Sequence, residues 1–336
     1  MHSFCTLFDS YYLSRGLALY NSLERHASSF HLYIFAFDDA SYQLLVNKNL
    51  KNATLISLKE FENERLLSVK DSRSKGEYCW TSTGSTIKYC IERYNLESCT
   101  YLDADLYFYA DPAILLKEVE DGSTLITEHR YTKKYDKSQT SGKYCVQFMT
   151  FHNNEESMKV LNSWIDSCID WCYAKAEDGK FGDQKYLDSW KDDFKNIHEL
   201  EHLGGGVAPW NVQQYNFKVV DNRVLGVEKS SGKEFELVFY HFHALKFLRD
   251  DFFELSVYEL NKKTIDIIYK PYIQEILKIN QELGEEFLVQ QEPLSNRTYT
   301  LKFIVKRIIE DWKSPFLAIY NRIFDKKNIY HKSCFQ

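Results

Sequence analysis

The chain has 336 residues, of which 44% are hydrophobic and 16% aromatic. This length and apolar content suffice for one large domain with a substantial core, and the low counts of glycine (13) and proline (5) exclude a fibrous or low-complexity chain. The formal net charge of −6 leaves no basic surplus, so nucleic acid is not an expected partner.

The cysteines and the N-terminal segment bear on the cellular compartment. Eight cysteines are scattered along the chain, mostly in apolar stretches. Cys168 and Cys172 are one helical turn apart, but no second pair completes a spacing typical of zinc sites. We therefore expect reduced, buried thiols in a cytoplasmic protein. The first residues lack a signal-peptide pattern, and no run reaches the ~20 apolar residues that a membrane-spanning helix needs.

The first part of the chain alternates between predicted strands and helices. Short apolar runs predict buried strands at residues 3–8, 30–37 and 54–58. Capping residues and apolar residues at helical spacing predict the intervening helices at residues 12–26, after Asp39, and at 59–68. This alternation predicts an α/β fold, in which helices flank a mostly parallel central sheet.

The same patterns predict the remaining elements. We expect helices at residues 87–94, 155–173 and 182–190, and strands at residues 100–102, 106–109, 124–127, 146–151 and 237–242. From about Phe252 onward, the spacing of apolar residues predicts helices. We place a boundary near residue 250, which divides a main domain at residues 1–250 from a helical C-terminal region at 251–336.

Two aspartates follow the predicted strand at residues 100–102. Asp103 and Asp105 are spaced i and i+2, so the turn that ends the strand can direct both carboxylates toward one hard cation. Apolar segments flank the pair, and burying two like charges without a compensating cation is costly. The alternative is a solvated strand end without a metal. We favour the metal site, because open α/β sheets bind ligands beyond the carboxyl ends of their strands.

Two further segments contain candidate site residues. His241 and His243 share one face of a predicted strand, where an imidazole would complete the metal shell, and Lys246 would pair with a phosphate. Asp183 and Gln184 would hydrogen-bond the hydroxyls of a sugar and stabilise the charge that develops at its anomeric carbon. The alternatives are ordinary polar residues at a strand end and a helix N-cap at Asp183.

In the order in which they follow one another along the chain, these motifs resemble those of GT-A type nucleotide-diphospho-sugar glycosyltransferases. They are similar to glycosyltransferase family 8 and to transferases of bacterial surface-polysaccharide clusters. The matching pieces lie at residues 6–9, 16–23, 80–83, 103–105, 142–151, 181–187 and 241–246. The resemblance implies a Rossmann-like GT-A catalytic domain at residues 1–250. It also implies that a sugar is transferred from a nucleotide-diphosphate donor, expected to be a UDP-sugar, to a glycan or lipid-linked hydroxyl, with retention of the anomeric configuration.

The resemblance also implies roles for individual residues. Asp103, Asp105 and His241 would hold Mn²⁺ or Mg²⁺, and Asp183 and Gln184 would be the catalytic residues near the anomeric carbon. Contacts with the nucleotide-sugar donor would come from Thr6, Asp9, Thr81, Lys88, Asp103, Ala104, His129, Gln147 and Lys246. Two positions depart from the family pattern. Ala244 stands where the late motif usually has glycine, and Lys246 lies one place earlier than its counterpart.

Three features stay open from the residues alone. His129 lies either beside the sugars or on the surface with Arg130. Trp210, in the glycine-rich loop at residues 204–211, either stacks on the acceptor or belongs to the core. The basic, amphipathic tail from Arg297 either lies on an anionic membrane surface, which would make the protein peripheral at the inner face of the membrane, or packs against its own domain.

Two other classes of function compete with glycosyl transfer. A sugar-phosphate nucleotidyltransferase usually has a basic, glycine-rich loop after its first strand, whereas residues 8–12 here are Phe-Asp-Ser-Tyr-Tyr. A non-catalytic sugar-nucleotide-binding protein would not need an intact aspartate pair together with His241. Both alternatives therefore rank below the transferase.

Overall fold

The computed structural model describes residues 1–248, 251–284 and 328–335. The chain divides into two compact units, Met1–His241 and Phe242–Gln336. The sequence places the boundary near residue 250, and the structural division comes earlier, directly after His241. The predicted basic tail lies outside the described residues as far as residue 327.

The first unit is built on a seven-stranded sheet with the strand order β3-β2-β1-β4-β7-β6-β8. Its strands are β1 (His2–Phe8), β2 (Phe30–Ala36), β3 (Ala53–Ser57), β4 (Ser98–Leu102), β6 (Thr124–Glu128), β7 (Tyr144–His152) and β8 (Ile197–Glu199). Strands β3, β2, β1 and β4 run parallel to one another, β7 is antiparallel to both β4 and β6, and β6 is parallel to β8. The predicted α/β fold with a mostly parallel central sheet is therefore confirmed.

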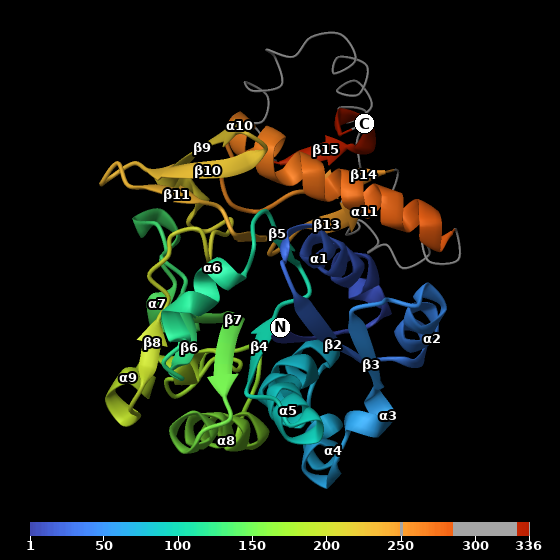
Figure 1. Cartoon of the computed structure of the whole chain (residues 1–336), viewed down its shortest axis with the longest axis vertical. Helices are drawn as coiled ribbons and strands as arrows, with labels where there is room; N and C mark the ends of the chain where they lie inside the picture. Colours follow the sequence, from blue (N-terminus) through green and yellow to red (C-terminus); the bar gives the residue numbers. More distant parts are fainter. Residues whose placement is uncertain (249–250, 285–327, 336) are drawn as a thin grey trace. The chain divides into compact units, whose positions relative to one another are not determined.

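Three long helices cover this sheet, namely α1 (Leu13–His26), α5 (Lys75–Tyr94) and α8 (Glu155–Asp170). Figure 1 shows α5 and α8 together on one face of the sheet and α1 on the other. Ser74 and Glu77 form a capping box that begins α5. The helix predicted at residues 87–94 therefore begins well upstream of residue 87, at Lys75.

The other helices of the first unit are short. They are α2 (Asp39–Lys48), α3 (Leu58–Phe61), α4 (Glu64–Lys70), α6 (Ala113–Leu116), α7 (Ser138–Ser141) and α9 (Trp190–Asp193). Single 3₁₀ turns occur at Ser10–Tyr12, Lys117–Val119, Lys133–Tyr135, Lys185–Ser189 and Val212–Gln214. Across the part of the chain that the structure describes, no helix combines the length and the apolar character needed to cross a bilayer.

Two small sheets complete the first unit. In one, β5 (Leu106–Phe108) pairs antiparallel with β12 (Phe239–His241). The other is an antiparallel sheet that the sequence patterns did not predict, formed by β9 (Tyr215–Val220), β10 (Arg223–Glu228) and β11 (Glu234–Glu236). Asp221 and Asn222 connect β9 to β10 with φ angles of 49° and 62°, positive values that are typical of tight hairpin turns.

The second unit contains an antiparallel sheet and a long helical segment. The sheet consists of β13 (Lys246–Leu248), β14 (Phe252–Glu254) and β15 (Ile329–His331). The helical segment runs from α10 (Lys262–Thr264) through a π-helical turn at Ile265–Tyr269 into α11 (Lys270–Leu283), and a 3₁₀ turn follows β15 at Lys332–Cys334. The helical prediction was wrong for β14, because this segment pairs with β15 from the far end of the chain.

Candidate active site

Strand β4 brings the two aspartates to the edge of the sheet where the parallel strands end. The chain turns after Leu102, and the backbone N–H of Leu106 donates to the carbonyl of Asp103 at 3.1 Å. The N–H of Asp103 donates to the carbonyl of Gln147 on β7 at 3.0 Å. Asp105 is buried, whereas the side chain of Asp103 is 29% exposed. Both carboxylates therefore lie at the edge where open α/β sheets bind their ligands.

His241 reaches the aspartates through strand pairing. Leu106 on β5 lies opposite His241 on β12, so Asp105, the residue before β5, is next to the histidine. Nε2 of His241 is 3.1 Å from Oδ1 of Asp105 and 3.6 Å from Oδ2 of Asp103. The three side chains that were predicted to share one site are therefore together in the structure.

The charges of these three residues shift one another's pKa values. Burial lowers the pKa of His241, but the carboxylates of Asp105 and Asp103 and a hydrogen bond with Cys145 outweigh it and raise that pKa well above its ordinary value. Burial raises the pKa of Asp103 to about 6, with His241 opposing the shift and Asp105 adding to it. Near neutral pH, the imidazolium of His241 therefore neutralises part of the negative charge of the aspartate pair.

Gln147 orients the imidazole ring. Its Oε1 lies 2.9 Å from Nδ1 of His241. With the amide in this orientation Nδ1 carries a proton and donates, so Nε2 is the ring nitrogen that faces the carboxylates and can bind an ion. Nε2 of Gln147 is itself buried and has no hydrogen-bond partner among the described residues. A bound ligand would supply the missing acceptor.

An aromatic wall, formed by His129, Tyr131 and Trp210, borders His241. Trp210 is buried, and its ring meets the imidazole of His241 edge to face with the centroids 5.3 Å apart. His129 stacks on Tyr131 at 4.5 Å and meets Trp210 at 5.1 Å. The indole N–H of Trp210 and the amide of Asn211 each donate to the carbonyl of His129 at 2.8 Å. The sequence left the places of His129 and Trp210 open, and the structure buries both of them. Trp210 packs against His241, and His129 packs against Trp210.

Asp183 enters the site from the segment that precedes the 3₁₀ turn at Lys185–Ser189. The indole N–H of Trp164 on α8 donates to its carbonyl at 2.8 Å. Burial and the negative charge of Asp103 raise the pKa of Asp183 to about 8, against a hydrogen bond with Thr83 on α5. A carboxyl that stays protonated near neutral pH can donate to a sugar oxygen. Thr83 was not predicted as a site residue, although it belongs to a hydroxyl-rich run that the sequence shows.

Two predicted residues have their side chains engaged elsewhere. The amide of Gln184 donates to the carbonyl of Ser141 at 2.5 Å, at the end of α7. The ammonium of Lys88 donates to Asn162 on α8 at 2.7 Å. The structure therefore does not bring Gln184 or Lys88 into contact with the aspartate pair.

The other residues of the first unit that were predicted to contact the nucleotide-sugar donor lie in β1, in the turn after β1, between the two aspartates and in α5. Thr6 in β1 is buried, and its hydroxyl has no partner among the residues that the structure describes. Asp9 caps the following 3₁₀ turn by accepting from the N–H of Tyr12 at 3.3 Å. Ala104 is buried between the two aspartates, and the hydroxyl of Thr81 donates to a carbonyl one turn earlier in α5.

The late motif continues into the second unit. His243 is exposed, and Lys246 begins β13. Ala244 has a φ angle of 62°, which lies in the left-handed region that favours glycine. This backbone conformation gives a physical reason why the related motif usually has glycine at the position of Ala244.

Two residues beside the aspartates were missed by the sequence patterns. The sulfur of Cys145, an oxygen of Asp103 and a ring nitrogen of His241 all lie within 4.8 Å of one another. Burial and the charge of Asp105 raise the pKa of Tyr12, which places its phenol near the site. The sequence could have indicated Cys145, because it lies two places before the predicted site residue Gln147, and residues at i and i+2 of a strand share a face.

The side chains of this site offer ligand atoms that suit a divalent metal ion. Asp103 and Asp105 offer carboxylate oxygens, and His241 offers an imidazole nitrogen. Oxygen donors with one nitrogen fit Mn²⁺ or Mg²⁺, and the adjacent sulfur of Cys145 adds a donor that softer ions prefer. These residues could therefore hold the predicted metal.

Comparisons with known proteins identify the fold. No family model matches the chain. Two uncharacterized proteins of Bacillus subtilis (strain 168) are similar, YfnD with 28% identity over 84% of this chain and 91% of its own length, and YfnF with 27% identity over 85% and 96%. The crystal structure of an active-site mutant of LgtC is similar with a TM-score of 0.50 and 10% identity, over 85% of this chain and 99% of LgtC. The chain has a GT-A fold. Another crystal structure shows the galactosyltransferase LgtC in complex with donor and acceptor sugar analogues.

Proposed function

We propose that this chain is a metal-dependent glycosyltransferase that moves a sugar from a nucleotide-diphosphate donor to the hydroxyl of a glycan or lipid-linked acceptor. The observation that carries the proposal is the convergence of Asp103, Asp105 and His241, in which Nε2 of the histidine is 3.1 Å and 3.6 Å from the two carboxylates. The GT-A fold supports it, because LgtC, which shares this fold, is a galactosyltransferase. A UDP-sugar is the donor that we would test first.

In this proposal each residue of the site has a distinct role. Asp103, Asp105 and His241 would hold Mn²⁺ or Mg²⁺, and the ion would supply positive charge for the diphosphate of the donor. The buried carboxyl of Asp183 hydrogen-bonds a hydroxyl of the donor sugar, and the unpartnered amide nitrogen of Gln147 donates to the donor. Transfer with retention needs no protein nucleophile if the leaving phosphate accepts the proton of the acceptor hydroxyl.

Other parts of the proposal rest mainly on the resemblance and on the sequence pattern. Donor contacts from Thr6, Asp9, Thr81, Lys88, Ala104, His129 and Lys246, and a catalytic role of Gln184 beside Asp183, belong to this group. So does a lipid-linked acceptor, which the basic tail from Arg297 would approach at the cytoplasmic face of a membrane. These assignments extend the central proposal, and the central proposal does not depend on them.

The deciding experiment measures nucleotide release. Purified chain is incubated with a panel of nucleotide-sugars with and without Mn²⁺, and slow, metal-dependent release of UDP from one UDP-sugar is the expected result. Asp105→Asn should abolish the release, because it removes a charged ligand, whereas Asp192→Asn at an exposed position should leave it unchanged. Full activity of Asp105→Asn would refute the metal assignment.

The same assay separates the competing functions. Release of pyrophosphate from UTP and a sugar phosphate would show a nucleotidyltransferase instead. A donor that raises the melting temperature with Mn²⁺ but is never turned over, even with a range of acceptors, would show a non-catalytic binding protein.

A further inference from the structure

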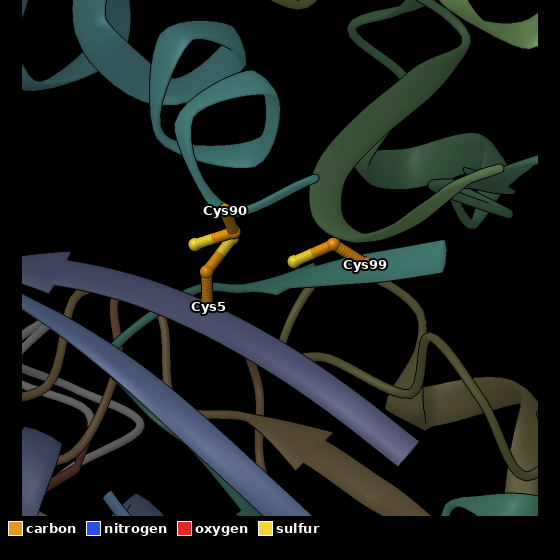
Figure 2. A group of neighbouring side chains, drawn as sticks. All are labelled: Cys5, Cys90 and Cys99. Atoms are coloured by element: carbon orange, nitrogen blue, oxygen red, sulfur yellow. The ribbon is translucent and has the colours of Figure 1, made fainter. Parts of the chain in front are cut away.

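Three cysteines far apart in the sequence meet beneath helix α5, on the face of the sheet that α5 covers. They are Cys5 on β1, Cys90 on α5 and Cys99 on β4, and the side chain of each is 0% exposed. Their three sulfur atoms all lie within 4.8 Å of one another. Figure 2 shows Cys99 extending its sulfur toward the other two side chains. We call this group the thiol cluster.

Strand register explains why the thiols face one another. β1 and β4 are parallel neighbours, and Cys5 lies opposite Tyr101, the residue two places after Cys99. Because side chains two places apart share a face of a strand, Cys5 and Cys99 point to the same side of the sheet. That side is covered by α5, which contributes Cys90.

A hydroxyl from helix α5 lies beside the thiol cluster. The sulfur of Cys5 is 3.8 Å from the hydroxyl of Thr86, one turn before Cys90 on the same helix. Burial raises the pKa values of Cys90 and Cys99 well above the ordinary range. The thiols of Cys90 and Cys99 therefore keep their protons in the metal-free protein.

We propose that the thiol cluster is a structural site for one thiophilic d¹⁰ metal ion, such as Zn²⁺ or Cu⁺, bound by the three sulfurs. Soft sulfur donors select these ions over Mn²⁺ and Mg²⁺. A tetrahedral zinc site with Zn–S bonds of about 2.3 Å has its sulfurs about 3.8 Å apart, so small side-chain rotations close the cluster around an ion. The hydroxyl of Thr86 is the nearest further oxygen donor to Cys5 that we identify.

The charge balance of the site follows from its burial. Each positive charge on the entering ion replaces one thiol proton, which leaves to solvent, and forms one metal–thiolate bond. Two deprotonated thiols and one neutral thiol around Zn²⁺, or one thiolate and two thiols around Cu⁺, give a neutral complex. A neutral complex avoids the large cost of a net charge in an apolar core.

The position of the thiol cluster gives the ion a mechanical role. It would join β1, β4 and α5, the three elements that lead to Thr6, Asp103 and Thr83 in the candidate active site. Because the sulfurs are fully buried, the ion enters as the chain folds, so binding energy adds to folding stability. The proposal stands apart from the proposed function, since it concerns a site that does not touch the donor.

The test uses Cd²⁺ as a spectroscopic substitute for Zn²⁺. The full chain is refolded under reducing conditions with increasing Cd²⁺, with Cys145→Ser and Cys334→Ser to remove the thiol beside the aspartates and the exposed thiol, and with Asp105→Asn to remove a ligand of the aspartate site. The expected result is one Cd²⁺ per chain with the ultraviolet charge-transfer band of cadmium–thiolate bonds, and a melting temperature several degrees higher. No band after refolding would overturn the proposal.

Matched variants assign the band to the thiol cluster. Cys99→Ala should lose the band and the thermal shift, whereas Cys168→Ala, an equally buried thiol in the same core, should keep both. A band that survives Cys99→Ala overturns the proposal. Because an alanine variant could fail to fold, X-ray absorption at the cadmium edge is also measured on the chain with all three cysteines present. Three sulfur neighbours are expected, and two or fewer would refute the site.

Discussion

Binding of Mn²⁺ to Asp103, Asp105 and His241 should displace a proton, so its apparent affinity should rise with pH. Nε2 of His241 faces the carboxylates at 3.1 Å and 3.6 Å, and the two negative charges raise the pKa of the imidazole well above 6.5. A metal ion and a proton cannot share this nitrogen. The ion must therefore compete with the proton that the aspartates themselves favour.

The size of the effect follows from the number of protons displaced. Between about pH 6.5 and the raised pKa of His241, one displaced proton tightens binding about tenfold per pH unit. Below about pH 6 the slope should steepen, because the pKa of Asp103 is raised to about 6 and a second proton must leave. A site of unperturbed residues would show almost no change above about pH 7.

Isothermal titration calorimetry in buffers with different ionisation enthalpies measures both the affinity and the protons released. We expect about one proton per Mn²⁺ near pH 7. His241→Gln should abolish the release, while His198→Gln, which removes a histidine paired with Glu118 at 2.8 Å, should keep it. An affinity that is independent of pH between about pH 6 and pH 8, with no proton released, would refute the arrangement described for this site.

Three further predictions concern stability and metal preference. Without metal, the free energy of unfolding should fall as pH rises from about 4 to 8 in urea titrations, because Asp183, Asp103 and His241 all have raised pKa values and the folded chain retains protons that the unfolded chain has lost. Each contributes at most about 1.4 kcal/mol per pH unit between its unfolded and folded pKa, and Asp183→Asn should flatten the dependence. Ala244→Gly should raise stability by about 0.5–1 kcal/mol, because the φ angle of 62° strains alanine, and an unchanged denaturation midpoint would contradict this. Cys145→Ser should weaken Cd²⁺ binding beside the aspartates by about tenfold and leave Mn²⁺ affinity within about threefold, as competition titrations would show.

The aspartate pair could be predicted from local pattern alone. Asp103 and Asp105 follow directly on an apolar strand, so their position at the end of β4 needs no knowledge of distant contacts. The start of α5 was also present in the sequence as Ser74 and Glu77, a serine and a glutamate three residues apart, and it was overlooked because the residues that follow are polar.

Contacts between distant segments could not be derived in this way. The pairing of Leu106 with His241 depends on β12 returning to β5. The spacing of His241 and His243 indicated an imidazole ligand, and the resemblance to a known family selected His241 of the two. The thiol cluster was not predicted from the sequence, for a related reason. Zinc spacings concern ligands that are close in sequence, whereas Cys5 and Cys99 meet because β1 and β4 are neighbours in the sheet.

The imidazolium of His241 changes the argument that first indicated a metal. The adjacent carboxylates of buried Asp105 and partly buried Asp103 need a compensating charge, and in the metal-free protein His241 itself provides one at 3.1 Å from Asp105. The site can therefore keep its geometry without an ion, because Gln147 orients the ring and Trp210 packs against it. What distinguishes a metal centre from a simple buried ion pair is whether this proton exchanges for a dication. The protons released on Mn²⁺ binding thus decide the question more directly than the shape of the site does.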